Sequence, residues 1–153
     1  MPEYFDISFI GKKTSKSKSE MDTCLSLFCL FEGENKSYLF EGKQIIVSYF
    51  DDEGSDFDEI TIGIPGQRFN KETFDSELKP FTNFVNRCFE CNPNLQYALC
   101  SYELNGYLIG QVKKIQDFRN DEFLKRFPII YKQVAPLELP RLEINTEAQD
   151  IFV

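Results

Sequence analysis

Short hydrophobic runs separated by polar turns dominate the pattern along this chain, and most of them are typical of strands. The segments expected to form strands are rich in β-branched and aromatic residues: 4–10, 23–31, 37–40, 44–50, 58–64 and 129–134. Within 58–64, every second residue from Ile60 to Ile64 is hydrophobic, so one face of this strand is expected to be buried. The run at 23–31 is too short to require a helix, and Gly33 after it favours a strand. The polar residues 11–20 predict an exposed loop.

One long segment has helical periodicity instead. Between residues 71 and 90, hydrophobic side chains recur every three or four positions and form one stripe: Phe74, Leu78, Phe81, Phe84, Val85 and Cys88. Asn70 suits the N-cap, and Pro80 either kinks this helix or belongs to the first turn of a helix that begins at Lys79. A second, short helix is predicted at about 120–127, capped by Asn120 and ended by Pro128.

The strongest local turn signal is Asn105-Gly106. Hydrophobic and aromatic residues flank this dipeptide at 96–104 and 107–112, and the dipeptide itself is typical of a two-residue type I′ turn. The sequence therefore predicts a β-hairpin in which Leu104 lies opposite Tyr107.

Together these elements predict a single α+β domain that spans residues 1–153, with a mainly antiparallel sheet, one main helix and one short helix. The length fits one domain, and no internal repeat or linker-like stretch divides the chain. The segment from residue 135, with Pro136 and Pro140, is expected to be extended, and residues 151–153 are expected to pack against the domain.

Composition and charge exclude several classes of function. The chain has 17 basic and 25 acidic residues, so its formal net charge is −8, and this charge opposes direct binding to nucleic acid or to an anionic membrane. It has no histidine, which excludes Ser-His-Asp triads, Cys-His pairs and His-ligated metals. Nucleophile elbows, phosphate-binding loops and dinucleotide fingerprints are missing as well. We therefore expect no enzymatic activity, no metal and no cofactor.

The five cysteines bear on the compartment. Five is an odd number, so a closed set of disulfides would leave one thiol over, and the acidic start of the chain lacks the features of a signal peptide. No hydrophobic run reaches the length of a membrane span. These observations predict reduced thiols and a cytoplasmic location.

Two candidate sites have plainer explanations. Cys88 and Cys91 form a CxxC pair of the kind that redox centres and zinc sites use, but Cys88 lies near the predicted end of a helix, where the dipole opposes a thiolate. Packing as small hydrophobic side chains is the better explanation. The four lysines within 12–18 could contact phosphate, but no aromatic residue lies among them, so a solvated loop is favoured.

The middle of the chain holds most of the negative charge. Residues 51–100 carry ten acids and four bases, a net charge of −6, and six of these acids lie within 51–59 without a base among them. The six acids lie between two predicted strands, so we expect an exposed loop: Asp51, Asp52, Glu53, Asp56, Asp58 and Glu59. Phe57 is either tucked beneath this loop or offered to a partner. The loop could be a solvated turn, a surface for a basic protein, or a carboxylate site for a divalent cation or catalysis.

In general character, being small, acidic, single-domain and without a catalytic motif, the chain resembles the immunity proteins of bacterial toxin systems, including contact-dependent inhibition. The resemblance implies a cytosolic protein that binds a cognate toxin domain, in many cases a nuclease with a basic cleft, and blocks its active site. The loop expected to bind the partner has seven residues: Asp51, Asp52, Glu53, Asp56, Phe57, Asp58 and Glu59. Two alternatives stay open: a metal-dependent carboxylate hydrolase that uses Asp51 or Asp58 with Glu103, and a structural or adaptor module that forms a homodimer through an edge strand.

Overall fold

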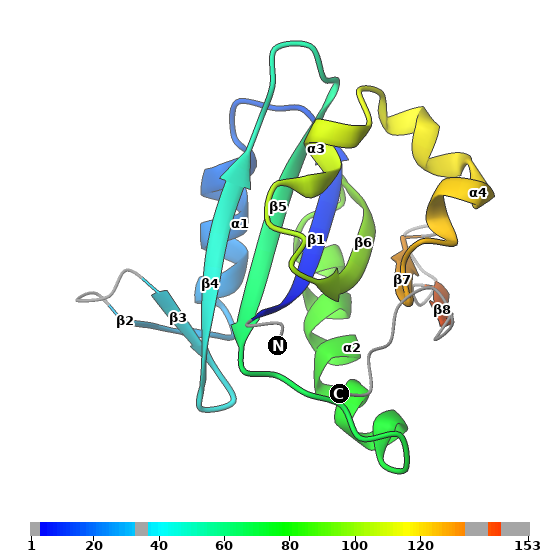
Figure 1. Cartoon of the computed structure of the whole chain (residues 1–153). Coiled ribbons are helices and arrows are strands. Elements are labelled where there is room, and N and C mark those ends of the chain that lie inside the picture. Colours follow the sequence, from blue (N-terminus) through cyan, green and yellow to red (C-terminus); the bar gives the residue numbers. More distant parts are fainter. Residues whose placement is uncertain (1–3, 33–36, 134–140, 145–153) are drawn as a thin grey trace.

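A computed structural model describes residues 4–32, 37–133 and 141–144, which form one twisted sheet with helices on both faces (Figure 1). The described strands are β1 (Tyr4–Lys12), β2 (Leu30–Glu32), β3 (Ser37–Phe40), β4 (Lys43–Phe50), β5 (Phe57–Pro65), β6 (Leu95–Tyr102), β7 (Ile129–Lys132) and β8 (Arg141–Ile144). The described helices are α1 (Ser17–Ser26), α2 (Phe74–Cys91), α3 (Tyr107–Gln111), the 3-10 helix η1 (Ile115–Arg119) and α4 (Asp121–Leu124). The strand order is β2-β3-β4-β5-β1-β6-β7-β8, and each neighbouring pair is antiparallel. The predicted α+β class with a mainly antiparallel sheet is confirmed.

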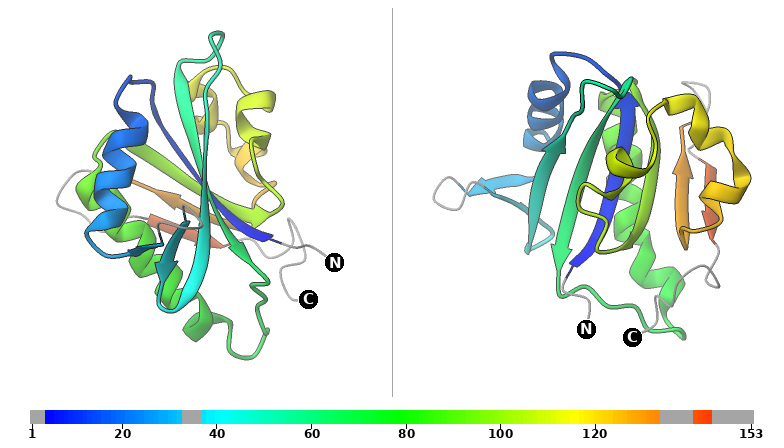
Figure 2. Two further views of the ribbon diagram at one scale, coloured as in Figure 1. Left: turned by 90° about the vertical axis from the view of Figure 1, so that its left-hand side faces the viewer. Right: turned by 45° about the horizontal axis from the view of Figure 1, so that its top comes forward.

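Each face of the sheet has its own hydrophobic core. Because side chains alternate along a strand, Phe5, Ile7 and Phe9 of β1 join the core beneath α1 and α2, whereas Ile10 joins the core beneath α3, η1 and α4. The two sets of helices lie on opposite sides of the sheet (Figure 2). Aromatic rings fill the first core, and Phe9 packs edge to face against Phe89 of α2 with ring centroids 5.8 Å apart.

The stripe predicted for the main helix is confirmed. The buried residues of α2 are Phe74, Leu78, Phe81, Phe84, Val85, Cys88 and Phe89. The helix begins at Phe74 and runs through Pro80, and its N-cap is Thr73 instead of Asn70. The side chain of Asn70 accepts a hydrogen bond from the backbone N–H of Glu72 at 2.9 Å, in the turn before the helix. The strands predicted at 4–10, 37–40, 44–50 and 58–64 are also found, and β7 covers most of 129–134.

The predicted strand at 23–31 and the predicted loop at 11–20 are wrong for most of their residues. β1 continues to Lys12, α1 occupies Ser17–Ser26, and only Leu30–Glu32 forms a strand. Met21, Cys24 and Leu25 have helical spacing and are the buried residues of α1. Because only three positions have this periodicity and polar residues surround them, the helix is recognisable only from its contact with the sheet and α2.

The predicted hairpin around Asn105-Gly106 is wrong as well. β6 ends at Tyr102, and Tyr107–Gln111 forms α3 instead of a returning strand. β6 pairs with β1 along one edge and with β7 along the other, so it has no free edge for residues 107–112. Gly106 keeps the positive φ of a turn, 70°, and a Cβ there would lie 2.9 Å from the ring of Phe50. This glycine therefore permits a close approach over the sheet as well as the turn.

The last predicted elements are partly described. The short helix expected at 120–127 is found as α4, which covers only Asp121–Leu124, and Asn120 Oδ1 accepts a hydrogen bond from the N–H of Glu122 at 3.0 Å. The expected extended segment from 135 and the packing of 151–153 lie outside the described residues, except for the four residues of β8. In the part of the chain that is described, no helix combines the length and apolarity needed to cross a membrane.

Candidate functional site at the tip of β4 and β5

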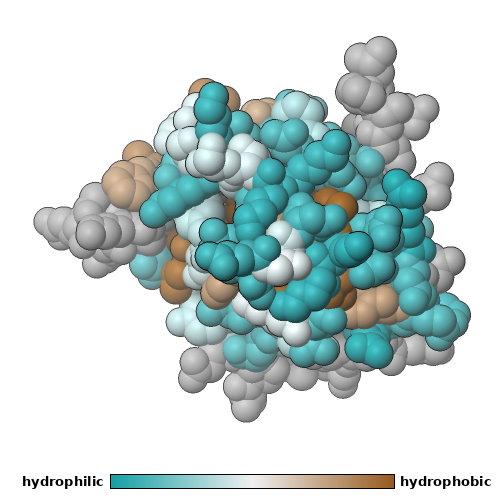
Figure 3. Space-filling model, turned by 90° about the horizontal axis from the view of Figure 1, so that it is seen from above, coloured by the Kyte–Doolittle hydropathy of each residue, from teal (hydrophilic) through white to brown (hydrophobic). Residues whose placement is uncertain are grey.

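The acidic segment lies at the end of the sheet where β4 turns into β5, at the top of Figure 1. The turn itself comprises only residues 51–56. Asp51, Glu53 and Asp56 are exposed there and Asp52 is half-buried, and we call these four residues the acidic tip. Seen from above, hydrophilic side chains cover most of this end of the molecule (Figure 3).

The expectation of an exposed loop is wrong for Phe57, Asp58 and Glu59. These three residues begin β5 and pair with the last residues of β1, so the sheet takes them out of the turn. Phe57 is fully buried and packs edge to face on Phe118, with ring centroids 5.2 Å apart. It is therefore tucked beneath the tip and is not offered to a partner.

Asp58 connects β5 to the beginning of α1. Its Oδ2 accepts hydrogen bonds from the N–H of Thr14 at 3.2 Å and from the hydroxyl of Ser17 at 2.6 Å. These bonds hold the lysine-rich residues 12–18 beside the acidic tip. The sequence presents the basic and acidic segments as separate candidates, and the fold places them next to each other.

Two lysines partly offset the charge of the acidic tip. Lys113 Nζ lies 2.7 Å from Asp52 Oδ2, and Lys13 Nζ donates to the carbonyl oxygen of Asp52 at 2.6 Å. The hydrogen bond from Lys113, together with one from the N–H of Gly54, lowers the pKa of Asp52 below its ordinary value. Asp52 is thus charged at neutral pH and forms an ion pair with Lys113.

The remaining tip acids differ in how firmly they are held. Asp56 Oδ1 accepts a hydrogen bond from the N–H of Ile115 at 2.7 Å, which fixes the turn against the start of η1. Asp51 and Glu53 are exposed and belong to none of the ion pairs found within the described residues. The acidic tip is therefore a turn held in place by hydrogen bonds. It presents the exposed carboxylates of Asp51 and Glu53, which form no ion pair within the described residues.

A hollow of about 250 Å³ lies beside the acidic tip, between the beginning of α1 and the end of β4. Its lining includes Ser17, Lys18, Tyr49 and Asp51. Lys18 Nζ lies 5.5 Å from the centroid of the Tyr49 ring, and the Tyr49 hydroxyl donates to Asp22 at 2.7 Å. Burial, together with that carboxylate, raises the pKa of Tyr49. The hollow thus combines the ammonium group of Lys18, the neutral phenol of Tyr49 and the carboxylate of Asp51, and this combination suits a charged side chain of a partner.

Glu59 and Asp6 hold a strap, residues 103–112, onto the sheet. Asp6 Oδ2 accepts a hydrogen bond from the N–H of Leu104 at 2.7 Å, and Glu59 Oε1 accepts one from the N–H of Ile109 at 2.9 Å. Burial raises the pKa of Asp6 to about 6, and burial also raises the pKa of Glu59 above its ordinary value. Asp6 is not among the residues expected from the sequence to form a site, although its place between two hydrophobic residues of a predicted strand is a signal for a buried carboxylate.

The carboxylates of the hydrolase alternative do not meet. Asp58 lies opposite Gly11 near one end of β1, whereas Glu103 donates its N–H to the carbonyl oxygen of Tyr4 at the other end. Tyr4 and Gly11 are seven positions apart along β1, a distance of about 23 Å. Asp51 follows the end of β4 and lies at the same end of the sheet as Asp58. Within the described residues, no three or more Cys, Asp or Glu side chains are placed to bind a metal ion.

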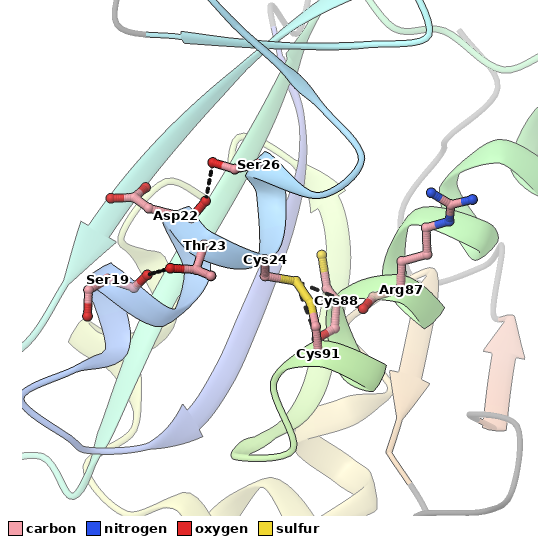
Figure 4. The surroundings of a disulfide bond; sticks show 8 residues. All are labelled: Ser19, Asp22, Thr23, Cys24, Ser26, Arg87, Cys88 and Cys91. Carbon is pink, nitrogen blue, oxygen red and sulfur yellow. Dashed lines mark hydrogen bonds between the residues drawn. A yellow bond between two sulfur atoms is a disulfide. The ribbon is translucent and has the colours of Figure 1, made fainter.

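The cysteines are arranged in a way that the sequence did not predict. A disulfide joins Cys24 of α1 to Cys91 at the end of α2, with Cα atoms 5.8 Å apart (Figure 4). Cys29, Cys88 and Cys100 are buried free thiols. The expectation of five reduced thiols is therefore wrong, because the unpredicted helix α1 carries Cys24 to the surface of α2.

Comparison with other proteins adds no residue roles to this arrangement. No family model, no curated protein and no solved structure matches the chain. The function of the acidic tip must therefore be inferred from its own residues and their surroundings.

Proposed function

We propose that the protein is an immunity-type inhibitor that binds a basic protein, a bacterial toxin domain, through the acidic tip. The observation that carries this proposal is the presentation of Asp51 and Glu53 on an anchored turn at the end of the sheet. A toxin with a basic substrate cleft, such as a nuclease, has the complementary charge, and the site of action is the bacterial cytoplasm.

The physics of association supports this role for a small, charged turn. Complementary charges steer two proteins together and select against partners of the same sign. Because hydrogen bonds to Asp52 and Asp56 already hold the turn, little conformational entropy is lost when a partner binds it. The hollow lined by Lys18, Tyr49 and Asp51 offers a place for a partner side chain beside these charges.

The proposed contact set is smaller than the one the sequence predicts. It consists of the acidic tip, with Asp51 and Glu53 at its centre. Phe57, Asp58 and Glu59 support the tip from below, since their side chains are buried in the sheet. Replacement of those three residues would therefore disturb the fold and would not report on binding.

Reversing the two outward charges is expected to weaken binding. The double variant Asp51→Lys with Glu53→Lys places two cations where the partner's basic surface docks, so the dissociation constant should rise at least about tenfold. The measurement is calorimetric titration of the toxin domain encoded by the neighbouring gene, at low and high salt. The salt dependence of binding should also become weaker.

The matched control is the double variant Glu41→Lys with Glu72→Lys. It makes the same change in net charge on exposed residues, and Glu41 lies in the turn at the opposite end of β4. Its affinity should stay within about a factor of two of the unsubstituted protein, because distant exposed charges are screened. Equal affinity for both double variants, with equal salt dependence, would show that the acidic tip is not the contact.

A second candidate function, a homodimeric adaptor, is favoured by one observation. β2 is the edge strand at one end of the sheet order, and the large side chains on and beside it are exposed: Leu27 at 73%, Leu30 at 68% and Phe31 at 52%. An exposed edge with hydrophobic side chains can pair with a second copy.

Sedimentation velocity at several protein concentrations tests the adaptor. If β2 mediates a dimer, the sedimentation coefficient should rise with concentration, and Leu30→Lys should abolish the rise because it places a charge on the edge. A single coefficient at every concentration would remove this candidate.

A further inference from the structure

Three cysteines meet where α1 crosses the last turn of α2 (Figure 4). Cys24 comes from α1, whereas Cys88 and Cys91 lie one turn apart on α2. Cys24 and Cys91 form the disulfide. Cys24 and Cys88 are buried, at 1% and 0% exposure, but Cys91 is exposed. Cys91 is thus the more exposed half of this disulfide.

Two shallow surface hollows open beside Cys91. One, of about 420 Å³, lies over Thr23, Cys24 and Asn94. The other, of about 380 Å³, has Arg87 and Glu90 in its lining. A small thiol compound can therefore approach Cys91 from the surface, and the guanidinium of Arg87 suits a compound that carries carboxylates.

We propose that Cys91 is a thiol–disulfide exchange site, at which a low-molecular-weight thiol such as glutathione forms a mixed disulfide and releases Cys24. The thiolate of the compound attacks Cys91 Sγ, a new S–S bond forms there, and the bond to Cys24 breaks. Cys24 leaves as a thiolate and takes up the proton that the compound lost. One disulfide replaces another, so the step consumes neither an oxidant nor a reductant.

The surroundings of Cys24 keep its released sulfur from attacking the mixed disulfide on Cys91. Its Sγ lies 3.9 Å from the carbonyl oxygen of Arg87 and 4.0 Å from that of Cys88. These carbonyls belong to the last turn of α2, where the negative end of the helix dipole stabilises a thiol relative to a thiolate. The released Cys24 therefore readily takes up the proton that the compound lost, and a protonated thiol does not attack the mixed disulfide.

Cys88 does not interfere at neutral pH. Its side chain is fully buried, and burial raises the pKa of its thiol well above the ordinary value. Although the CxxC spacing places Cys88 one turn from Cys91, the thiolate needed to expel the adduct is scarce. Neither neighbouring thiol therefore expels the adduct, and the adduct on Cys91 is the expected product of the first exchange; a second molecule of the thiol would release it as the oxidised form of that compound.

Exchange at Cys91 removes the covalent link between α1 and α2. α1 is then held by noncovalent contacts, which include the burial of Met21 and Leu25 and the hydrogen bonds from Ser17 to Asp58 and from the Tyr49 hydroxyl to Asp22. Local opening of α1 becomes easier, whereas the central strands keep their pairing. This inference stands independently of the proposed inhibitor function.

Peptide mapping tests the site directly on the unsubstituted protein. The folded protein is incubated at neutral pH with reduced glutathione that does not exceed the protein in amount, so that a second exchange does not remove the adduct. Free thiols are then blocked with an alkylating reagent, and the peptides are identified by mass spectrometry. The expected result is glutathione on Cys91 and the alkyl group on Cys24. Glutathione on Cys24, a Cys88–Cys91 disulfide, or no adduct on the folded protein would each overturn the proposal.

Two variants and an exchange measurement complete the test. Cys88→Ala should still form the adduct, whereas Cys91→Ser should not, and loss of the adduct in Cys88→Ala would assign the reaction to Cys88. In the adduct, backbone amides of α1 should exchange with deuterium at least about tenfold faster, with those of β1 and β5 unchanged. Unchanged exchange in α1 would show that the disulfide does not hold this helix.

Discussion

Replacing Cys91 with serine is expected to lower the free energy of unfolding by about 4 kcal/mol. The disulfide from Cys24 joins residues separated by 67 positions, so it removes many conformations from the unfolded chain. Cys91 is exposed, so the serine itself costs little packing. Urea unfolding without reductant measures this loss of stability. Because the chain has no tryptophan, unfolding is followed by far-UV circular dichroism.

The control for this variant is Cys29→Ala, which removes a buried free thiol and leaves the disulfide intact. Its loss of stability should be clearly smaller, because only one sulfur atom of packing disappears. Adding reductant should destabilise the unsubstituted protein to about the level of Cys91→Ser and leave Cys91→Ser unchanged. If Cys91→Ser and the unsubstituted protein are equally stable without reductant, the disulfide does not stabilise the folded state.

Replacing Asp6 with asparagine is expected to raise stability at neutral pH by up to about 3 kcal/mol. Burial raises the pKa of Asp6 from 3.8 to about 6, so the folded state keeps a proton that the unfolded state has lost between these values. The stabilisation from this group is therefore complete below the unfolded pKa and is lost as the pH rises through 6. Asparagine keeps an oxygen that can accept the hydrogen bond from Leu104 without the buried charge.

Urea unfolding at a series of pH values from about 4 to 8 checks this prediction. The free energy of unfolding of the unsubstituted protein should fall as the pH rises across that range. In Asp6→Asn, the slope of this free energy against pH should be smaller. Asp75→Asn, which removes one carboxylate from the exposed surface of α2, is the matched control for the change in net charge. If Asp6→Asn is instead less stable at neutral pH, the charged carboxylate is what holds the strap in place.

Glu59 shapes the same pH dependence. Its pKa is also raised by burial, and it binds the strap at Ile109 while Asp6 binds it at Leu104. Both carboxylates therefore make the folded state more stable, relative to the unfolded chain, at lower pH. Substitution of Asp6 alone should reduce the slope without removing it, since Glu59 remains.

The positions of the sheet strands and of α2 are predictable from local patterns. β5 shows its alternation in Ile60, Ile62 and Ile64, and α2 has a hydrophobic stripe over 18 residues. Patterns of this length outweigh the local preferences of single residues such as Pro80. α1 and α3 have three and two buried residues, which is too short a periodicity to recognise.

The candidate site is predictable only in its position along the chain. The cluster of acids between β4 and β5 is evident from the sequence, and it does lie at a turn. Which acids face outward depends on where the pairing of β5 with β1 begins, and it begins at Phe57. The partners Lys13 and Lys113 come from segments far away in the chain, so their ion pairing and hydrogen bonding with Asp52 depend on the fold.

By itself, the sequence determined the α+β class, the main helix, most strands and the place of the acidic turn, because each depends on a pattern within a few turns or one strand. Only the tertiary structure decided that Tyr107–Gln111 is a helix, since β1 and β7 occupy both edges of β6. It likewise decided that Cys24 meets Cys91 and that Phe57, Asp58 and Glu59 are buried. These features depend on which edges and faces remain free once distant segments have paired, and no local pattern contains that information.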